Sequence, residues 1–337
     1  MKKIIFAALF FPLLFTGQIK NMDVPFAEYP YDNSSCSGFK HPTGSLVFIP
    51  SDAFVMEDGS NCKGKIVIKY RELHTRIDML ASGINMILYR EGKRKMLESV
   101  GMFEISATCS GKPMKLANGK FIQVRMKCLR NADNLQAFFY EKDKGYWTDE
   151  ATAVTDFSYK KNDNNADNFK LWGNSSVGNT AIQNIELEGN DSAYMKMVNT
   201  MMGSLPEGFI KGMNVKTMGI HNYDFVIKDE KAIPIIAKFK LKTGEDITEV
   251  VRVAYTKKNT LIQYSPDDMA ERFVLLPEKG IRIFVYYEDG SVAIMNQEEL
   301  DKLNLSNLRG KEHTFLLEKL PAKPKDRAAL AEATRIK

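Results

Sequence analysis

The sequence predicts an all-β fold, consisting of two β-sandwich domains in tandem with few short helices. Three segments carry the clearest signal, residues 65–70, 103–107 and 121–126, in which apolar and polar residues alternate. One face of each predicted strand would therefore be apolar and the other solvated. Helical patterns are sparse, and many short strands at close spacing are typical of sandwiches rather than of parallel α/β sheets.

Glycine-containing turns separate the predicted strands. Asp58-Gly59, Ser110-Gly111 and Asn118-Gly119 accept the positive φ that hairpin turns require. The clearest hairpin is expected around Asp289-Gly290, and a second strand pair around Thr243-Gly244. The strands expected beside these two turns are 281–287 with 291–295, and 237–242 with 250–255. The few helices expected are 191–202, 298–303 and 327–336.

A polar stretch divides the chain of 337 residues, which is long enough for two domains. Residues 162–168 and 173–176 are rich in Asn, Asp, Gly and Ser and have little to bury. The predicted organisation is a signal peptide (1–17), a lead-in segment (18–37), an N-terminal sandwich (38–150), a polar connection (151–194), a second, immunoglobulin-like sandwich (195–318) and a basic helical tail (319–337).

The first residues resemble a secretory signal peptide. Lys2 and Lys3 precede an unbroken apolar run over 4–15, which is too short to span the roughly 30 Å core of a membrane. Gln18 stands where a bacterial lipoprotein has its acylated cysteine, so no lipid anchor is expected. We therefore expect an exported protein that is periplasmic, outer-membrane-associated or secreted, without a membrane span once the signal is removed.

The charge balance argues against nucleic-acid binding. The net charge is +5, and removal of Lys2 and Lys3 leaves 45 basic and 42 acidic residues, or +3. Such a balance provides no broad positive field to attract a polyanion.

Four cysteines are present, Cys36, Cys62, Cys109 and Cys128. An even number in an exported chain predicts disulfides, with three alternative connectivities. One hairpin centred on Asn118-Gly119 would place Cys109 opposite Cys128, which favours that pair. Against it, Ser110-Gly111 would form a second turn and Pro113 would interrupt one long ladder. Buried free thiols are the alternative.

Catalytic and metal-binding motifs are absent from the sequence. The four histidines have no metal-ligand spacing, and no H-E-x-x-H, G-x-S-x-G or phosphate-binding glycine loop occurs. Asp163, Asn165 and Asp167 have the alternate spacing that opens a calcium loop. That loop lacks its glycine and its final acidic ligand, so a solvated linker is favoured. No cofactor is expected.

An aromatic cluster lies late in the first predicted domain and includes Tyr140, Tyr146 and Trp147. Such rings stack on sugars in carbohydrate-binding proteins, but rings that alternate along a strand usually fill a core. Both interpretations stay open at this point.

Several segments resemble a known β-sandwich. Residues 44–50 (GSLVFIP), with Ala53-Phe54, Asp58-Gly59 and 64–72 (GKIVIKYRE), resemble the opening of the sandwich shared by ankyrins, netrin receptors and zonula-occludens proteins. The closer resemblance is to uncharacterised exported or cell-surface proteins of Bacteroidota-type bacteria. It continues through ASGINM at 81–86 and ESVGMFEI at 98–105, and MGIHNYD at 218–224 is similar to the start of their C-terminal β domain.

The resemblance implies a protein-interaction role rather than catalysis. Some relatives of the eukaryotic sandwich cleave themselves at a His-Phe-Ser turn, which this chain lacks, since His313-Thr314-Phe315 has the wrong order. We expect a non-catalytic interaction or structural module whose partners are envelope or surface proteins. The alternatives are a carbohydrate-binding module, or a glycan or peptide hydrolase with dispersed carboxylates.

Overall fold

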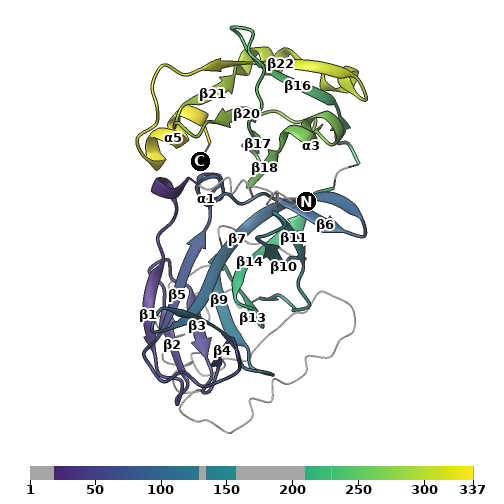
Figure 1. Cartoon of the computed structure of the whole chain (residues 1–337). Coiled ribbons are helices and arrows are strands. Elements are labelled where there is room, and N and C mark those ends of the chain that lie inside the picture. Colours follow the sequence, from purple (N-terminus) through teal and green to yellow (C-terminus); the bar gives the residue numbers. More distant parts are fainter. Residues whose placement is uncertain (1–18, 129–133, 157–208, 229, 337) are drawn as a thin grey trace, which may run out of the picture.

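The computed structural model describes residues 19–128, 134–156, 209–228 and 230–336. Strands dominate these residues and the helices among them are short, so the predicted all-β class is confirmed. Two sheets of mainly N-terminal strands and one C-terminal sheet meet at a compact junction (Figure 1). The predicted signal peptide, the helix expected over 191–202 and the calcium candidates Asp163, Asn165 and Asp167 lie outside the described residues.

The largest sheet is organised around one strand of 17 residues, β7. The first residues of β7 pair with β6, and β6 also pairs with β11. The five strands β7, β14, β10, β11 and β6 therefore form a closed ring. The strands of this sheet, in spatial order, are β1 (Ala27–Tyr31), β5 (Ile66–Leu73), β7 (Lys93–Cys109), β14 (Gly219–Val226), β10 (Gln136–Glu141), β11 (Tyr146–Asp149) and β6 (Ile87–Arg90), with β8 (Lys112–Leu116) beside β7 and β4 (Phe54–Met56) beside β8.

A β-bulge lies in the middle of β7. The register of β7 and β14 shifts between Tyr223, opposite Gly101, and Asp224, opposite Ser99, which leaves Val100 unpaired. Gly101 allows the facing sheet to approach closely, because a Cβ atom at this position would lie 2.6 Å from Cε of Met126. A bulge bends its strand and increases the local twist. We infer that this bend helps the first half of β7 to reach β6.

The second sheet lies across an apolar core from the first. Phe103 and Tyr223 of the larger sheet pack in one buried cluster with Val124 and Met126 of the smaller one. The Tyr223 hydroxyl also donates to the carbonyl of Val124 (3.2 Å). The strands of this smaller sheet are β12 (Thr155–Asp156), β13 (Phe209–Val215), β9 (Ile122–Cys128), β3 (Leu46–Ile49) and β2 (Ser37–Lys40).

Two strands that follow the polar stretch in sequence belong to these N-terminal sheets. β13 pairs with β9 along its whole length, and β14 lies between β7 and β10. The sheets therefore do not follow the expected start of a second domain at residue 195. The segment MGIHNYD, expected to open a C-terminal domain, instead contributes a central strand of the largest sheet.

The C-terminal strands form a six-stranded sheet and a two-stranded ribbon. Both edges of the six-stranded sheet are covered by backbone from neighbouring segments. At one end residues 245–247 return along β16, and at the other Met86 donates to the carbonyl of Leu261 in β18 (3.0 Å). The strands, in spatial order, are β16 (Ile236–Leu241), β22 (Glu312–Lys319), β21 (Val292–Met295), β20 (Ile281–Tyr286), β17 (Val251–Tyr255) and β18 (Thr260–Tyr264), and the ribbon pairs β15 (Ile233–Pro234) with β19 (Val274–Leu275).

The predicted hairpin around Asp289-Gly290 is confirmed, because β20 and β21 pair across it. The expected pairing around Thr243-Gly244 is wrong. The turn does reverse the chain, but only residues 245–247 then run back along β16. The next strand, β17, lies between β18 and β20, and β16 pairs in parallel with β22. The helices predicted near 298–303 and 327–336 are confirmed. The helical elements are η1 (Lys20–Met22), α1 (Arg76–Ser82), α3 (Pro266–Glu271), α4 (Gln297–Lys302), η2 (Leu305–Leu308) and α5 (Arg327–Thr334).

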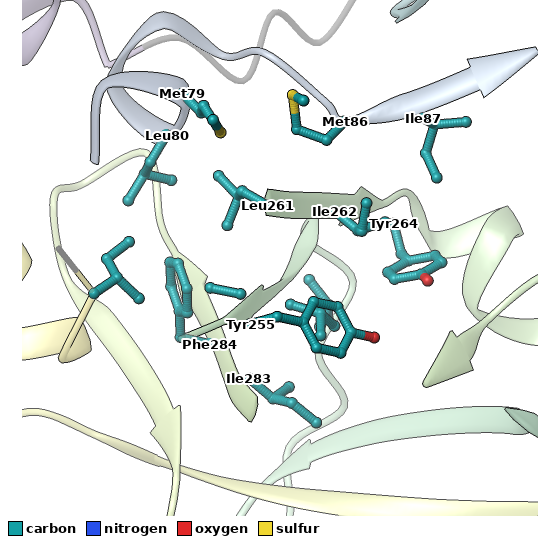
Figure 2. Packing of buried hydrophobic residues seen from close by; sticks show 14 of the residues in the cluster. Met79, Leu80, Met86, Ile87, Tyr255, Leu261, Ile262, Tyr264, Ile283 and Phe284 are labelled. Atoms are coloured by element: carbon teal, nitrogen blue, oxygen red, sulfur yellow. The ribbon is translucent and has the colours of Figure 1, made fainter. Parts of the chain in front are cut away.

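One apolar cluster joins the N-terminal sheets to the C-terminal sheet. Met79 and Leu80 of α1 face Leu261 of β18 and Phe284 of β20 (Figure 2). The sequence stops α1 at this point because Gly83 adopts the left-handed conformation of a helix C-cap (φ +71°). The chain then runs beside β18 instead of continuing the helix.

Asn85 fastens the two parts together through a pair of hydrogen bonds. Its Nδ2 donates to the carbonyl of Gln263 (2.9 Å), and its Oδ1 accepts from the amide of the same residue (3.0 Å). The Asn85 carbonyl accepts from Nε1 of Trp147 (2.9 Å), whose side chain is fully buried in the junction cluster. Backbone and side chain of one residue thus connect β11 with β18.

The two ends of the described chain meet at the same junction. The expected lead-in is attached, because Ile19 donates to the carbonyl of Ala81 (2.8 Å) and Asp23 pairs with Arg71 (2.6 Å). In the expected tail, Arg327 of α5 forms an ion pair with Asp78 of α1. Leu330 and Ile336 of this C-terminal segment are buried in the junction cluster. Both ends therefore belong to the folded core.

Candidate functional site

One disulfide, between Cys62 and Cys109, is present in the structure (Cα–Cα 5.9 Å), and Cys36 and Cys128 lie outside this bridge. The bridge ties the loop before β5 to the end of β7. The pairing of Cys109 with Cys128 is therefore wrong. Cys109 lies opposite Lys112 across the Ser110-Gly111 turn, whereas Asn118-Gly119 carries the chain from one sheet into the other.

The predicted aromatic residues do not form an exposed platform together. Trp147 and Tyr140 are buried in the junction cluster, where their rings contact each other (centroids 4.9 Å apart). Tyr146 is half-buried and its ring lies 5.3 Å from that of Tyr89, at an angle of 33°. Tyr89 is 43% exposed, so this second pair of rings reaches the surface.

His41 and His74 lie near each other around the buried Glu72, whereas His221 belongs to a different polar arrangement. Glu72 is buried, with one carboxylate oxygen accepting from the Tyr70 hydroxyl (2.8 Å) and the other 2.7 Å from Nε2 of His74. Burial would raise the pKa of Glu72, but the hydrogen bond and charge of His74 outweigh it and hold this pKa below its usual range. Both oxygens are thus engaged within the sandwich. Nearby, burial lowers the pKa of His41, whose Nδ1 contacts the Tyr29 hydroxyl (2.9 Å).

His221 is a buried structural link. Its Nε2 lies 2.9 Å from the carbonyl oxygen of Thr217, which can only accept, so this nitrogen carries a hydrogen. Its Nδ1 lies 2.7 Å from a carboxylate oxygen of Glu150. With both ring nitrogens occupied, His221 fastens the loop after β11 to β14.

A buried polar cluster lies where the C-terminal sheet meets β7 and β14. Asn222 accepts from the Ser99 hydroxyl (2.9 Å) and donates to Oδ2 of Asp224 (2.6 Å). Asn259, in the turn between β17 and β18, donates to the carbonyls of His74 (2.7 Å) and Ser99 (3.2 Å). Asp224 is fully buried, and this burial raises its pKa well above the usual range, which favours the protonated, neutral carboxyl.

A surface groove of about 410 Å³ opens beside the junction. The β6–β7 hairpin forms one wall, and the other is formed by Ala232, by Tyr264 of β18, by Arg272 just after α3 and by Val274 of β19. Ile87 and Tyr264, which lie on the same side of the junction core in Figure 2, contribute to these walls. We call this the hairpin groove. Its lining residues are Ile87, Tyr89, Gly92, Arg94, Lys95, Met96, Ala232, Tyr264, Arg272 and Val274.

Ion pairs hold the walls of the hairpin groove in position. Arg94 of β7 makes two hydrogen bonds to the carboxylate of Asp268 in α3 (2.7 and 3.3 Å). Arg272, at the end of α3, lies 3.7 Å from the same carboxylate and is 58% exposed. Asp268 is also held by the local structure, because its amide donates to the hydroxyl oxygen of Ser265, the N-cap of α3 (3.2 Å). Arg94 is therefore fixed, whereas Arg272 is exposed toward solvent.

A second groove of about 340 Å³ lies further along the same junction. We call it the connector groove, because Ile227, Lys228 and Lys231, which lie between β14 and β15, form part of it. Within it Lys258 pairs with Glu278 (3.4 Å). Its lining residues are Glu98, Phe225, Val226, Ile227, Lys228, Lys231, Lys258, Leu276, Pro277 and Glu278.

Sequence reasoning missed both grooves. Arg94 and Asp268 are 174 positions apart, and nothing in either segment indicates that they meet. The Glu91-Gly92 turn between residues 87–90 and the start of β7 is the one local signal for the exposed hairpin.

In residues 19–336, leaving out the gaps, no three His, Cys, Asp or Glu side chains are grouped as a metal site would require. Among the helices of the described part of the chain, none has the length and apolar character needed to cross a membrane.

The chain was compared with family models, curated proteins and solved structures. No family model, no curated protein and no solved structure matches it. The resemblance to the ankyrin and netrin-receptor sandwich therefore stays a prediction.

Proposed function

We propose that this protein is exported and acts without catalysis as a protein-interaction module of the cell envelope, with its partner held in the hairpin groove. The observation that carries the proposal is the groove itself. It combines the exposed ring of Tyr89 with basic and apolar walls, which is the composition typical of interface cores. Its walls come from two parts of the chain that a common core holds rigidly together.

The cysteines and the leader support export. A disulfide persists in oxidising compartments and is rare in the cytosol, and Cys62 is joined to Cys109. The cationic and apolar pattern of residues 1–17 is that of a signal peptide. Together they favour the periplasm, the outer-membrane surface or the medium.

Side-chain recognition in a groove is favoured over addition of a partner strand. Both ends of the C-terminal sheet are covered by backbone from elsewhere in the chain. In the largest sheet, the outer strand β1 contains Pro30, which has no N–H to donate to an added strand. A partner would therefore contact the side chains of the hairpin groove.

Site-specific photocrosslinking tests the proposal. We would place benzoylphenylalanine at Tyr89 and, as a matched control, at Leu316, which is also 43% exposed but lies in β22. After incubation with envelope extract, we expect a discrete protein adduct from position 89 and none from position 316. No adduct at 89, or the same adducts at both positions, would contradict the proposal.

The same experiment addresses the carbohydrate-binding alternative, which the rings of Tyr89 and Tyr146 favour. An adduct at position 89 that resists protease but is shortened by glycan-degrading enzymes would identify a glycan ligand. Export is tested separately, by cell fractionation and by the mass of the mature N-terminus. We expect the protein in the envelope or medium without its leader.

A further inference from the structure

We propose that β2 and the turn that follows it, residues 37–45, form an acid-sensitive flap that opens when His41 is protonated. The flap lies outside both grooves, and the inference does not depend on the function proposed above. Three observations lead to it. The flap is an outer element of the sandwich, His41 fastens its far end, and the groups around His41 do not offset the cost of charging it inside the fold.

The flap has little buried surface. In the described part of the chain β2 pairs with β3 alone, and none of the four residues of β2 is fully buried. The turn after it is closed by its own backbone, with the amide of His41 donating to the carbonyl of Ser45 (2.8 Å) and that of Gly44 to the carbonyl of His41 (2.9 Å). Short elements with little buried surface open at a lower free energy than core strands do.

The two ends of the flap are held in different ways. Just before the flap, Asn33 forms two hydrogen bonds with the backbone of Phe54 (both 3.1 Å). At the far end, Nδ1 of His41 lies 2.9 Å from the Tyr29 hydroxyl in β1. Between these points the ring of Phe39 stacks on that of Tyr29 (centroids 3.6 Å apart). Loss of the His41 contact would therefore release the far end while Asn33 keeps the start in place.

Charged and titratable groups from three strands surround His41. Its ring meets that of Tyr70 edge-on (centroids 5.0 Å apart). Glu72 attracts a positive charge on His41, and His74 repels it. Both oxygens of Glu72 already have partners, the Tyr70 hydroxyl (2.8 Å) and Nε2 of His74 (2.7 Å). Among the described residues the set consists of Tyr29 of β1, Lys40 of β2, Tyr70 and Glu72 of β5, and His74 just after β5.

Protonation of His41 is unfavourable while the flap is closed. Burial lowers the pKa of His41, the attraction of Glu72 acts against this effect, and the repulsion of His74 adds to it. Tyr29 keeps its proton, since burial and Glu72 raise its pKa. Its hydroxyl can therefore donate to a neutral Nδ1, whereas a protonated Nδ1 no longer accepts a hydrogen bond. The closed flap thus favours neutral His41, and an open flap leaves His41 free to take up a proton.

Proton linkage gives the direction and the limit of the response. Because the pKa of His41 is lowered in the closed state, the stability of that state is complete above the ordinary value of 6.5 and is lost as pH falls. From pH 7 to pH 5 the open fraction rises by at most about 25-fold, the limit reached when the closed state takes up no proton. Glu72 stays ionised over this range, because burial raises its pKa but the hydrogen bond and charge of His74 hold it below the usual 4.5.

Opening would change the surface that the sandwich presents. It would expose the stacked rings of Tyr29 and Phe39 and remove the partner strand of β3, whose four residues are all buried. An uncovered strand edge is a template for pairing with another chain. The flap would therefore cover this edge near neutral pH and release it in acid.

Amide hydrogen exchange of the full mature protein at pH 7 and pH 5 tests the inference, with exchange times corrected for the pH dependence of the chemical step. We expect the protection of residues 37–45 to fall several-fold, and by no more than about 25-fold, between the two pH values. At pH 5 the amides of β20 should remain at least about tenfold better protected than those of the flap, which marks a local opening.

Two histidine variants identify the group responsible. In H41Q the protection of residues 37–45 should differ by less than about twofold between the two pH values. H313Q is the matched control, because burial also lowers the pKa of His313 but this residue lies in β22. It should respond as the wild type does. Each variant is compared with itself at the two pH values, so a general loss of stability in H41Q does not affect the readout.

A nuclear magnetic resonance titration provides a second measurement. The imidazole resonance of His41, assigned by its absence from the H41Q spectrum, should titrate with a midpoint below 6.5. A midpoint at or above this value would overturn the inference. So would equal protection of residues 37–45 at both pH values, a wild-type response in H41Q, loss of the response in H313Q, or protection of β20 no better than that of the flap.

Discussion

Asn85→Ala is expected to lower the free energy of unfolding by about 2–4 kcal/mol. The substitution removes two hydrogen bonds to the backbone of Gln263, each contributing about 1 kcal/mol, and leaves an amide and a carbonyl without their partner. Gln263 is only 8% exposed, so water replaces these bonds poorly. The added cost of unsatisfied groups accounts for the upper part of the range.

A matched variant is available elsewhere in the chain. Asn33 makes the same pair of bonds to Phe54, with Nδ2 donating to the carbonyl and Oδ1 accepting from the amide (both 3.1 Å). Asn33→Ala should therefore have a similar cost in urea denaturation. The two variants differ in position, because Asn33 supports β4 in the sandwich whereas Asn85 supports the walls of the hairpin groove.

Hydrogen exchange and crosslinking separate the two effects. Asn85→Ala should speed exchange at the Gln263 amide and reduce crosslinking from position 89, and Asn33→Ala should speed exchange at Phe54 and leave crosslinking unchanged. A change of less than about 0.5 kcal/mol in the first variant would refute the role of Asn85 in the junction. Equal loss of crosslinking in both would show that general stability, not the junction, governs binding.

Three further predictions concern the cysteines and the buried titratable groups. Labelling of the denatured, unreduced protein should detect two thiols, and four would refute the bridge. Cys62→Ser should lower the free energy of unfolding, measured in urea, by about 4 kcal/mol, because the bridge closes a loop across a separation of 47 residues. Asp224 has a raised pKa in the folded state, so its contribution to stability is complete below its unfolded pKa and is lost as pH rises. Asp224→Asn should therefore stabilise the protein at pH 7 by at least about 1 kcal/mol and reduce the pH dependence of unfolding, and a loss of stability would contradict a neutral Asp224. His41 has a lowered pKa, so its contribution to stability is complete above its unfolded pKa of about 6.5 and is lost as pH falls. His41→Gln should therefore make stability fall less steeply between pH 7 and pH 5. An unchanged slope would contradict this role of His41.

Local patterns predicted several of the strands but, apart from one hairpin, not their partners. The alternation over 65–70 and 121–126 corresponds to β5 and β9, and the turn at Asp289-Gly290 joins the hairpin expected of it. Alternation reports that one face of a strand is buried and says nothing of which strand lies beside it. Asn118-Gly119 looked like the turn of one hairpin, yet it joins strands of two different sheets.

Pairings between distant segments lie beyond such reasoning. β13 and β14 follow a long polar stretch, and their alternation is compatible with any sheet. Their place beside β9 and β7 depends on complementary packing, such as the position of Tyr223 above Val124. The candidate site is even harder to predict, because its walls come from segments far apart in sequence, such as those that carry Arg94 and Asp268. Residue type alone indicated Tyr140 and Trp147 as rings that could stack on a sugar, whereas both side chains are buried in the core.

The rigidity of the junction bears directly on how the grooves could bind. A partner that had to draw two loosely linked domains together would lose much of its binding energy in ordering them. Here α1, Asn85 and α5 fasten the C-terminal sheet to the N-terminal ones through one apolar core, and the two ends of the described chain meet on it. The walls of the grooves are thus in place before a partner arrives. Weakening the junction should therefore slow or weaken binding even where every groove side chain is intact, and that is the outcome by which Asn85→Ala differs from Asn33→Ala.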